Sequence, residues 1–306
     1  MSILILGANG MLGSAFVAKR SLLEKFFSPI FFAYHSKPKK SREKNICSVM
    51  FDATDPLSLQ ILLSEINPEI IVNCAAMTIV EDCEENPDLA YKINAEFPGI
   101  LAEWTAKHGK KLIHYSTDAV FDGKNPPVDG YTEIDKVHPL NLYAKSKLKG
   151  EQLVLKIDPN ALVLRTNIIG IRGRKPYPLV EWILRTLAAG RKVTSFTDVV
   201  FAPLFIEDIV KLTIEALREN LYGLYNLNAK NRISKYRFAK LLAKEFGYDS
   251  NLVLPVKSGL VLSIPRPQKT YLNSLVFARK IKISLPMVNQ GVTHLHQSIK
   301  SDKFRL

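Results

Sequence analysis

The sequence predicts an α/β fold, a doubly wound parallel sheet with a smaller C-terminal lobe. Apolar runs of strand length alternate with longer stretches of helical period, which is typical of parallel strands joined by helices. Most of these runs are uninterrupted and rich in β-branched or aromatic residues, as expected of strands covered on both faces. A glycine-rich turn, GANGMLG, follows the first run directly and opens a helical stretch.

Six strands are expected in the first part of the chain. They are SILILG at 2–7, FFAYH at 31–35, SVMFD at 48–52, IIVNCA at 70–75, KLIHYS at 111–116 and LVLRT at 162–166. Between the fourth and the fifth, residues 86–109 carry apolar side chains at three- and four-residue steps and end at Gly109, which predicts an amphipathic helix. Pro98 is expected to kink or interrupt that helix.

The alternation loosens after residue 166. RGRKPYP at 172–178 is predicted to be a loop, and helices are expected over 178–190, 205–219 and 234–247. The sequence contains no internal repeat and no long Gly/Ser linker, so the second half is expected to rest on the sheet as a smaller lobe. Trp104 and Trp182 are expected on the core faces of their helices.

The chain carries a formal charge of +13, which calls for an anionic partner. Its basic residues are scattered, without the aromatic interleaving of a single-strand binder or the spacing of a zinc finger. This distribution favours a phosphorylated small molecule over nucleic acid. For any single basic cluster, a solvated surface is the simpler interpretation.

Targeting signals and cysteine spacing exclude several classes of protein. No apolar run approaches the roughly 20 residues that cross a bilayer, and the glycine turn comes too early for a signal peptide. We therefore expect a cytoplasmic protein with no membrane partner. Cys47, Cys74 and Cys83 lack the even count of a disulfide framework and the spacing of a zinc site, so we expect reduced thiols and no metal site. The oligomeric state stays open, and a homodimer is compatible with the sequence.

The turn GANGMLG has the context of a Rossmann-type dinucleotide site, with a merely tight strand-to-helix turn as the alternative. Gly7 permits the turn, Gly10 lets backbone N–H groups approach a pyrophosphate, and Gly13 lets helix and strand pack closely. The following helix adds a favourable dipole for the phosphates. We accordingly divide the chain into an NAD(P)-binding domain at 1–166 and a substrate lobe at 167–306, partly interleaved with the sheet. The expected cofactor contacts in the turn are Gly7, Asn9, Gly10, Met11, Leu12 and Gly13.

The end of the second strand favours NADP and leaves NAD open. Sites that prefer NAD usually carry an acidic residue there, whereas this chain reads AYHSKPKK. Ser36, Lys37 and Lys39 could receive the 2′-phosphate, although such lysines can also be solvated loop charges. After the third strand, Asp52 could accept from the adenine amino group, with Ala53 beside it. The alternative for Asp52 is a cap on the helix that starts near Pro56.

A tyrosine and a lysine are spaced for proton transfer. In NLYAKSK, Tyr143 precedes Lys147 by four residues, so both project from one helix face. An ammonium near a phenol favours the phenolate and brings its acidity closer to neutral pH. Tyr143 could then protonate a carbonyl oxygen while a hydride arrives at carbon, and Lys147 could also hold the nicotinamide ribose. Ser116 and Thr117, at a strand end, could hydrogen-bond the same oxygen.

These motifs resemble the extended short-chain dehydrogenases/reductases, and within them the dTDP-4-dehydrorhamnose reductases. STDAVFDG resembles the family's S-T-D-Y-V-F-D-G, and PLNLYAKSKLKGE resembles its P-x-N-x-Y-G-x-S-K-x-x-G-E. NCAAMTIVEDCEENPDLAYKINAEFPGILA, LVLRTNIIG and IPRPQKTYLN are similar to further family elements. The matches spread from Gly7 to about Asn273.

The resemblance implies an enzyme that transfers hydride from NAD(P)H to the C4 ketone of a nucleotide-linked deoxysugar. The residues that it implies are, for catalysis, Thr117, Tyr143 and Lys147; for the cofactor, also Asn73, Cys74, Ala75 and Ala76; for the sugar nucleotide, Thr78, Thr117, Asp118, Ile168 and Arg266. Arg266 could hold a diphosphate oxygen or merely order its loop. Asn94 could position groups near Lys147 or be an ordinary polar residue of its helix.

Departures from the family pattern lie on the substrate side. Ala119 stands where the family has tyrosine, and Ile168 where it has tryptophan, so the sugar and the nucleotide stay open. Other functions of the same fold are also kept: a regulatory subunit that binds NADP without catalysis, as in the β-subunit of methionine adenosyltransferase, or a sugar-nucleotide epimerase or dehydratase. His35, His114 and His138 have no ligand spacing and are expected to be structural.

Overall fold

A seven-stranded, fully parallel sheet forms the centre of the computed structural model, which describes residues 1–36, 45–260 and 264–301. Its strands stand in the order β11-β6-β5-β4-β1-β2-β3. Their bounds are β1 Ile3–Leu6, β2 Ile30–Tyr34, β3 Ile46–Met50, β4 Ile70–Asn73, β5 Lys111–Thr117, β6 Leu162–Thr166 and β11 Gly223–Leu227. The six expected strands are confirmed. The direction of winding reverses between β1 and β4, which is where ligands bind in open sheets of this kind.

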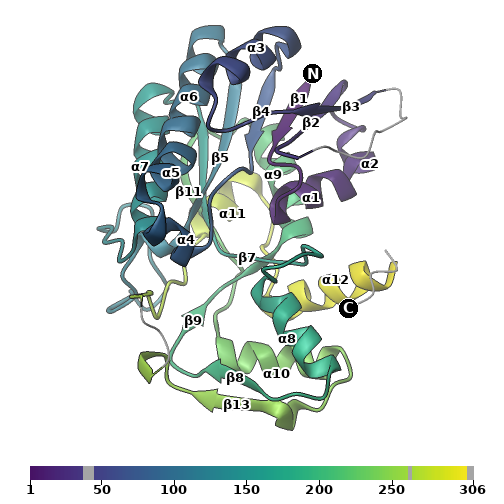
Figure 1. Cartoon of the computed structure of the whole chain (residues 1–306), viewed down its shortest axis with the longest axis vertical. Coiled ribbons are helices and arrows are strands. Elements are labelled where there is room, and N and C mark those ends of the chain that lie inside the picture. Colours follow the sequence, from purple (N-terminus) through teal and green to yellow (C-terminus); the bar gives the residue numbers. More distant parts are fainter. Residues whose placement is uncertain (37–44, 261–263, 302–306) are drawn as a thin grey trace.

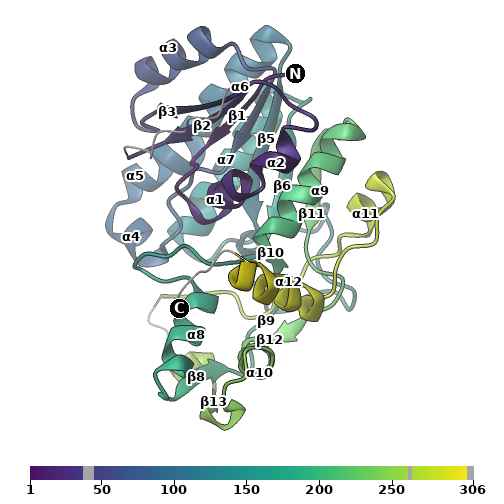
Figure 2. The same ribbon diagram turned by 90° about the vertical axis from the view of Figure 1, so that its right-hand side faces the viewer.

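Helices cover both faces of the sheet, so the fold is a doubly wound α/β fold as expected (Figures 1 and 2). Alternate residues of β1 enter different cores: Ile3 and Ile5 on one face, Leu4 and Leu6 on the other. The helices of the first face are α1 (Met11–Ala18), α2 (Arg20–Leu23) and α9 (Ile206–Arg218); those of the second are α3 (Pro56–Ile66), α6 (Phe97–His108) and α7 (Leu142–Ile157). Burial on both faces explains why the strands read as continuous apolar runs.

The segment at 86–109 is helical but interrupted, as Pro98 suggested. Helix α5 (Pro87–Tyr91) runs into a π-helical turn, Lys92–Glu96, and α6 follows it. Pro98 lies in the first turn of α6, directly after the π-helical turn, and has no backbone N–H to donate to that preceding turn. The stop at Gly109 is confirmed, because this residue caps α6 with φ +64°.

The second half contributes to the sheet and also builds a lobe of its own. The helices expected there are confirmed as α8 (Leu179–Ala188), α9 and α10 (Lys235–Glu245), whereas β11 was not expected. Three short pairs complete the lobe: β7 (Ile168–Ile169) with β10 (Leu204–Phe205), β9 (Val200–Phe201) with β12 (Ile233–Ser234), and β8 (Val193–Phe196) with β13 (Val253–Val256). Two further helices, α11 (Leu275–Ile281) and α12 (Val288–Ser301), follow.

Sheet and lobe share one hydrophobic core. Val180 of α8, Phe238 of α10 and Val292 of α12 belong to the same buried cluster as Ile3 of β1. The expectation for Trp182 is wrong: its side chain is 40% exposed, because the residues beside it fill the buried face of α8. Trp104 does pack against the second core. Within the described residues, no helix is both long and apolar enough to span a bilayer.

Candidate functional site

The glycine turn packs so closely that side chains would not fit. Gly7 adopts φ +79°, and a Cβ there would lie 2.8 Å from the backbone nitrogen of Ala75. A Cβ on Gly13 would lie 2.1 Å from the carbonyl oxygen of Gly7. The backbone N–H of Gly10 donates to that same oxygen at 2.8 Å, and Gly10 is the N-cap of α1. The turn therefore packs backbone closely against backbone where helix α1 begins.

A cavity of about 720 Å³ lies at this turn and at the ends of the neighbouring strands. Its wall contains most of the residues that the sequence singled out. These are Gly7, Asn9, Gly10, Met11, Leu12, Asp52, Ala53, Asn73, Cys74, Ala75, Ala76, Thr78, Tyr143, Lys147, Ile168 and Arg266. They come from the glycine turn, from the ends of β3 and β4, from α7 and from the lobe.

Four candidate residues do not line the cavity. Gly13 lies behind the turn, and Ser36 accepts a hydrogen bond from Asn9 Nδ2 at 3.0 Å. Thr117 and Asp118 are buried beneath the wall, 5% and 4% exposed. Lys37 and Lys39 lie outside the described residues, so their expected role in binding a 2′-phosphate stays a prediction.

Asp52 is not a helix cap. The N-cap of α3 is Asp55, whose carboxylate accepts from the backbone of Leu57 and Ser58. Asp52 instead lines the cavity and accepts from the backbone N–H of Thr54 at 2.8 Å and from its hydroxyl at 2.7 Å. These hydrogen bonds lower the pKa of Asp52, so the carboxylate stays ionised and can accept from a ligand donor.

Tyr143 lies in the first turn of α7, which Asn141 caps by accepting from the backbone N–H of Ala144 at 3.0 Å. Burial raises the pKa of the Tyr143 phenol to about 12, and a hydrogen bond with Thr117 opposes that rise. We expected Lys147 to lower this pKa; that expectation is wrong for the chain alone, because desolvation of the phenolate dominates. The phenol thus holds its proton at neutral pH.

Lys147 is 3% exposed, one helical turn further along α7. Its Nζ donates to the carbonyl oxygen of Tyr115 at 2.6 Å and lies 3.4 Å from His114 Nε2. Burial lowers the pKa of Lys147 to about 8, against the attraction of Glu151 and Cys74. Glu151 is itself ion-paired with Arg165, which donates to its carboxylate from Nε at 3.0 Å and from Nη2 at 2.5 Å.

Asn94 connects two segments of the chain through hydrogen bonds and is not merely an ordinary polar residue of its helix. It is fully buried in the π-helical turn, where its Oδ1 accepts from the backbone N–H of Met77 at 2.9 Å. Its Nδ2 donates to the Met77 carbonyl oxygen at 2.9 Å and to Ser146 Oγ at 3.0 Å. Asn94 therefore links the segment after β4 to the helix that carries Tyr143 and Lys147.

Asp118 serves a buried network in this conformation. Its carboxylate accepts from Asn167 Nδ2 at 2.8 Å, from the Thr270 hydroxyl at 2.5 Å and from the Thr117 hydroxyl at 3.3 Å. Burial raises the pKa of Asp118, while these donors and the charge of Lys235 oppose the rise. The predicted sugar contact of Asp118 stays a prediction, since its oxygens are engaged here.

The loop at 172–178 brings cationic side chains to the cavity, which the sequence did not predict. Arg172 and Arg174 line it, and Arg174 Nη2 donates to the backbone oxygen of Asn9 at 3.0 Å. The fully buried carboxylate of Glu181 in α8 holds the loop, accepting from the backbone N–H groups of Arg172 and Gly173 at 3.1 and 3.0 Å. RGRK was the available signal, but sequence spacing does not reveal a contact 165 residues away.

Arg266 reaches the cavity from another loop of the lobe. It forms an ion pair with Glu81 of α4 (Val80–Glu85), and both residues line the wall. This pair joins the lobe to the segment that follows β4. The Arg266 side chain is 36% exposed and lines the cavity, so it is accessible to a ligand anion.

Polar atoms without partners converge on this cavity. In the part of the chain that the structure describes, six buried side-chain polar atoms have no hydrogen-bond partner. Four of them belong to residues on the cavity wall: Ser116 Oγ, Thr166 Oγ1, Arg172 Nε and Arg266 Nε. Because unsatisfied buried groups are costly, this concentration indicates that the wall is completed by a polar ligand.

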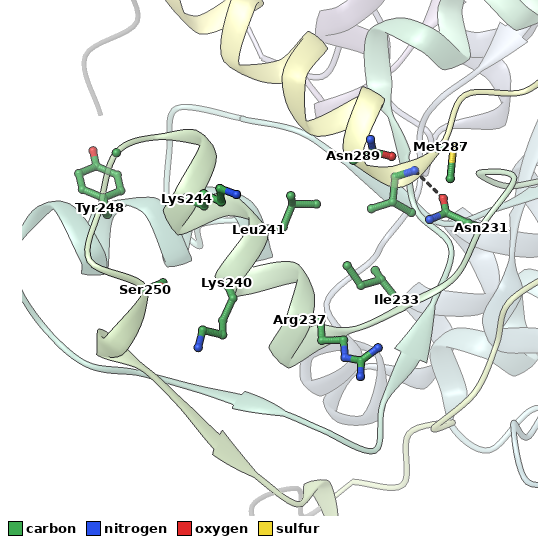
Figure 3. Close-up of a pocket in the computed structure, with 12 residues that line it drawn as sticks. Asn231, Ile233, Arg237, Lys240, Leu241, Lys244, Tyr248, Ser250, Met287 and Asn289 are labelled. Atoms are coloured by element: carbon green, nitrogen blue, oxygen red, sulfur yellow. Dashed lines mark hydrogen bonds between the residues drawn. The ribbon is translucent and has the colours of Figure 1, made fainter.

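A second cavity, of about 890 Å³, lies between α10 and the start of α12. Figure 3 shows Arg237, Lys240 and Lys244 along α10, with Asn289 across from them. None of the unpartnered buried atoms of the described chain belongs to its wall. The described residues also contain no group of three or more His, Cys, Asp or Glu side chains that could hold a metal ion.

A Rossmann-type sheet, with the tyrosine and the lysine on the wall of the cavity at its glycine turn, defines the class. The protein is an NAD(P)-dependent oxidoreductase. More narrowly, the chain belongs to the family described as the RmlD substrate binding domain, whose profile matches residues 1–301. The resemblance found in the sequence motifs is thereby confirmed.

Curated relatives cover most of the chain. A probable low-salt glycan biosynthesis reductase of Haloferax volcanii is 34% identical over 270 residues, 86% of this chain and 85% of the relative. A dTDP-4-dehydrorhamnose reductase of Mycobacterium tuberculosis is 32% identical over 272 residues, 87% and 81%. The β-subunit of methionine adenosyltransferase 2 of Rattus norvegicus is 29% identical over 289 residues, 89% and 80%.

A solved relative shares the whole architecture. The crystal structure of dTDP-4-dehydrorhamnose reductase from Bacillus anthracis in complex with NADP superposes with a TM-score of 0.80 at 26% identity. The match covers 97% of this chain and 99% of that one. The lobe is therefore common to both proteins, along with the sheet.

Proposed function

We propose that the protein reduces the C4 ketone of a nucleotide-activated deoxysugar with NADPH. The observation that carries the proposal is a protonated tyrosine beside a buried lysine, on a cavity wall where four polar atoms lack partners. The names of the Haloferax and Mycobacterium relatives support a glycan precursor or sugar nucleotide as substrate. The NADP in the Bacillus structure supports that cofactor.

The residues present fit a dinucleotide. The turn suits a diphosphate, because Gly7, Asn9 and Gly10 line the cavity where helix α1 begins. Asp52 and Ala53 suit the adenine end, and Lys147 suits the nicotinamide ribose. When bound, the reduced nicotinamide supplies the hydride. NADPH is favoured over NADH because the end of β2 carries no acid and Ser36 is tied to Asn9 of the turn.

Tyr143 is proposed as the proton donor. Its raised pKa keeps the phenol protonated at neutral pH, which a donor to a carbonyl oxygen requires. Thr117, at the strand end, lowers the pKa of the Tyr143 phenol, and we assign to it the role of orienting that phenol. Lys147 stands one turn along the same helix, where it can stabilise the phenolate left after transfer.

The lobe is proposed to hold the substrate. Arg172, Arg174 and Arg266 place positive charge on the cavity wall, which suits the diphosphate of a nucleotide sugar. Thr78 and Ile168 also line the wall and are assigned to the sugar. Ala119 and Ile168 are smaller than the tyrosine and tryptophan that the family has at these positions, so the preferred sugar is expected to differ from the family's usual one.

The test is a panel of nucleotide 4-keto-sugars with NADPH, followed at the nicotinamide absorbance. Tyr143→Phe is expected to lower the rate about 100- to 10,000-fold, because it removes only the donated proton. The NADPH dissociation constant, measured by fluorescence, should stay within a few-fold. Tyr177→Phe, at another tyrosine of the same wall, is the matched control and should keep most of the activity.

Each remaining outcome points to one alternative. Full activity in Tyr143→Phe would refute the proton-donor role. Tight NADPH binding without turnover of any sugar would favour a regulatory subunit instead of an enzyme. Conversion of a nucleotide sugar without net NADPH oxidation would favour an epimerase or dehydratase.

A further inference from the structure

A chain of buried polar groups leads from the end of β4 to Lys147. The backbone N–H of Ala75 donates to Asn73 Oδ1 at 3.0 Å, and Asn73 Nδ2 lies 3.1 Å from His114 Nδ1. On the far side of the ring, His114 Nε2 lies 3.4 Å from Lys147 Nζ. Asn73 and His114 are each 1% exposed, so water does not compete for these contacts.

The first two contacts determine where the imidazole carries its proton. Because Asn73 Oδ1 accepts from a backbone N–H, the group that faces His114 is the amide NH₂, which can only donate. His114 Nδ1 must therefore be the acceptor, and a neutral ring then carries its hydrogen on Nε2. Burial and the neighbouring Lys147 hold the pKa of His114 well below its ordinary range, so the ring is neutral.

The contact between His114 Nε2 and Lys147 Nζ then favours one protonation state of Lys147 over the other. An ammonium has no lone pair, so the Nε2–H of His114 would face another donor. A neutral amine has a lone pair that can accept from Nε2–H, and it still has a hydrogen for the Tyr115 carbonyl oxygen at 2.6 Å. The other ionisable groups that act on Lys147 are Glu151 and Cys74, which favour the ammonium.

We propose that Asn73 and His114 are positioning residues for Lys147: the amide fixes the Nε2–H form of the imidazole, and that N–H favours the neutral amine. Lys147 then exchanges its proton with its surroundings at lower pH than an ordinary lysine. Only one part of this inference rests on the proposed function: that Lys147 exchanges protons with Tyr143 during catalysis. The hydrogen-bond pattern itself is a property of the chain without ligand.

The tautomer of His114 is the direct test. In protein labelled with ¹⁵N-histidine, a long-range ¹H–¹⁵N correlation spectrum distinguishes protonated from bare ring nitrogens, and His114→Gln assigns the signal. We expect bare Nδ1 and protonated Nε2 throughout the neutral pH range. An Nδ1–H tautomer or an imidazolium would overturn the proposal, and the tautomer itself is observed in the unaltered protein.

The titration of Lys147 is the second test, followed by NMR of ¹³Cε-labelled lysine and assigned with Lys147→Met. His114→Phe removes the opposing N–H and should raise the Lys147 midpoint by about one pH unit. Asn73→Asp should raise it further, because a carboxylate accepts from Nδ1–H and leaves Nε2 as an acceptor for the ammonium. His108→Phe, at an exposed histidine bonded to the Trp104 carbonyl, is the control and should leave the midpoint unchanged.

These readouts separate the inference from the proposed function. Unchanged Lys147 midpoints in folded His114→Phe and Asn73→Asp protein would refute the positioning role, even if the enzyme reduces a keto-sugar. Shifted midpoints together with the expected tautomer would uphold it, even if no tested sugar is reduced.

Discussion

The two walls of the cavity present different kinds of atoms to a ligand. The wall from the glycine turn to Ala76 is largely backbone and small side chains, packed so closely that Gly7 and Gly13 have no room for a Cβ. The wall from the lobe presents long cationic side chains, Arg172 and Arg174, on a loop that one buried carboxylate secures. A rigid wall suits a constant cofactor, and a wall of long side chains can be altered to suit different substrates.

The largest effect is expected on the rigid wall. Gly13→Ala would place its Cβ 2.1 Å from the Gly7 carbonyl oxygen, and overpacking of this kind costs about 3 kcal/mol. The turn must shift, so we expect NADPH affinity to fall roughly 100-fold, by the same energy converted to a dissociation constant. Calorimetric titration would measure it. Gly99→Ala is the control, since its Cβ would come no closer than 3.8 Å to Leu153, and unchanged binding is expected there.

An intermediate effect, with opposite sign, is expected at Lys147. The pKa of Lys147 falls from 10.5 to about 8 on folding, so burying the ammonium lowers the free energy of unfolding by about 3 kcal/mol. Lys147→Met removes this cost but also loses the hydrogen bond to the Tyr115 carbonyl oxygen. The substitution should therefore stabilise the protein by about 2 kcal/mol. Between pH 8 and pH 10.5, Lys147 is protonated in the unfolded chain but not in the folded one. The stability gained by Lys147→Met is therefore complete below pH 8 and disappears above pH 10.5.

Urea unfolding at several pH values checks the Lys147 prediction. Lys145→Met, at an exposed lysine of the same helix, should change little. A loss of stability in Lys147→Met at neutral pH would mean that the lysine is held by more than the contacts described above.

The smallest effect is expected on the wall from the lobe, which carries Arg172 and Arg174. Arg174→Gln removes one charged hydrogen bond to Asn9 and should weaken NADPH binding about five-fold, or about 1 kcal/mol. Arg191→Gln, an equal change of charge at an exposed residue of the lobe outside the cavity wall, is the control. A 100-fold loss in Arg174→Gln would show that this wall is as constrained as the glycine turn.

The rigid wall was also the part that the sequence predicted well. Six strands, the turn at Gly7 and the stop at Gly109 follow from short-range patterns, because strand runs, tight turns and helix caps depend on neighbouring residues. Strand β11 was not predicted, because the residues of its sequence, GLYNL, are only partly buried. Its place beside β6 also depends on a long-range pairing.

The other wall depended on contacts that sequence patterns do not record. Arg174 meets Asn9 across most of the chain, and Glu81 meets Arg266 at a similar separation. His114 was expected to be structural, and nothing in HYS indicates that its ring lies between Asn73 and Lys147. Tyr143 and Lys147 were found because four residues separate them on one helix, yet the direction of the Tyr143 pKa shift depended on burial.

The place of β11 at the edge of the sheet has a consequence for synthesis on the ribosome. A nascent chain that has emerged only as far as residue 166 holds six strands, with β6 as an open edge and without α9 on the first face. Translation at about 5 to 20 residues per second keeps that edge unpaired for several seconds, until Leu227 has emerged. During this interval the unpaired backbone N–H and C=O groups along β6 can pair with a strand of another chain, so this edge is where aggregation would begin.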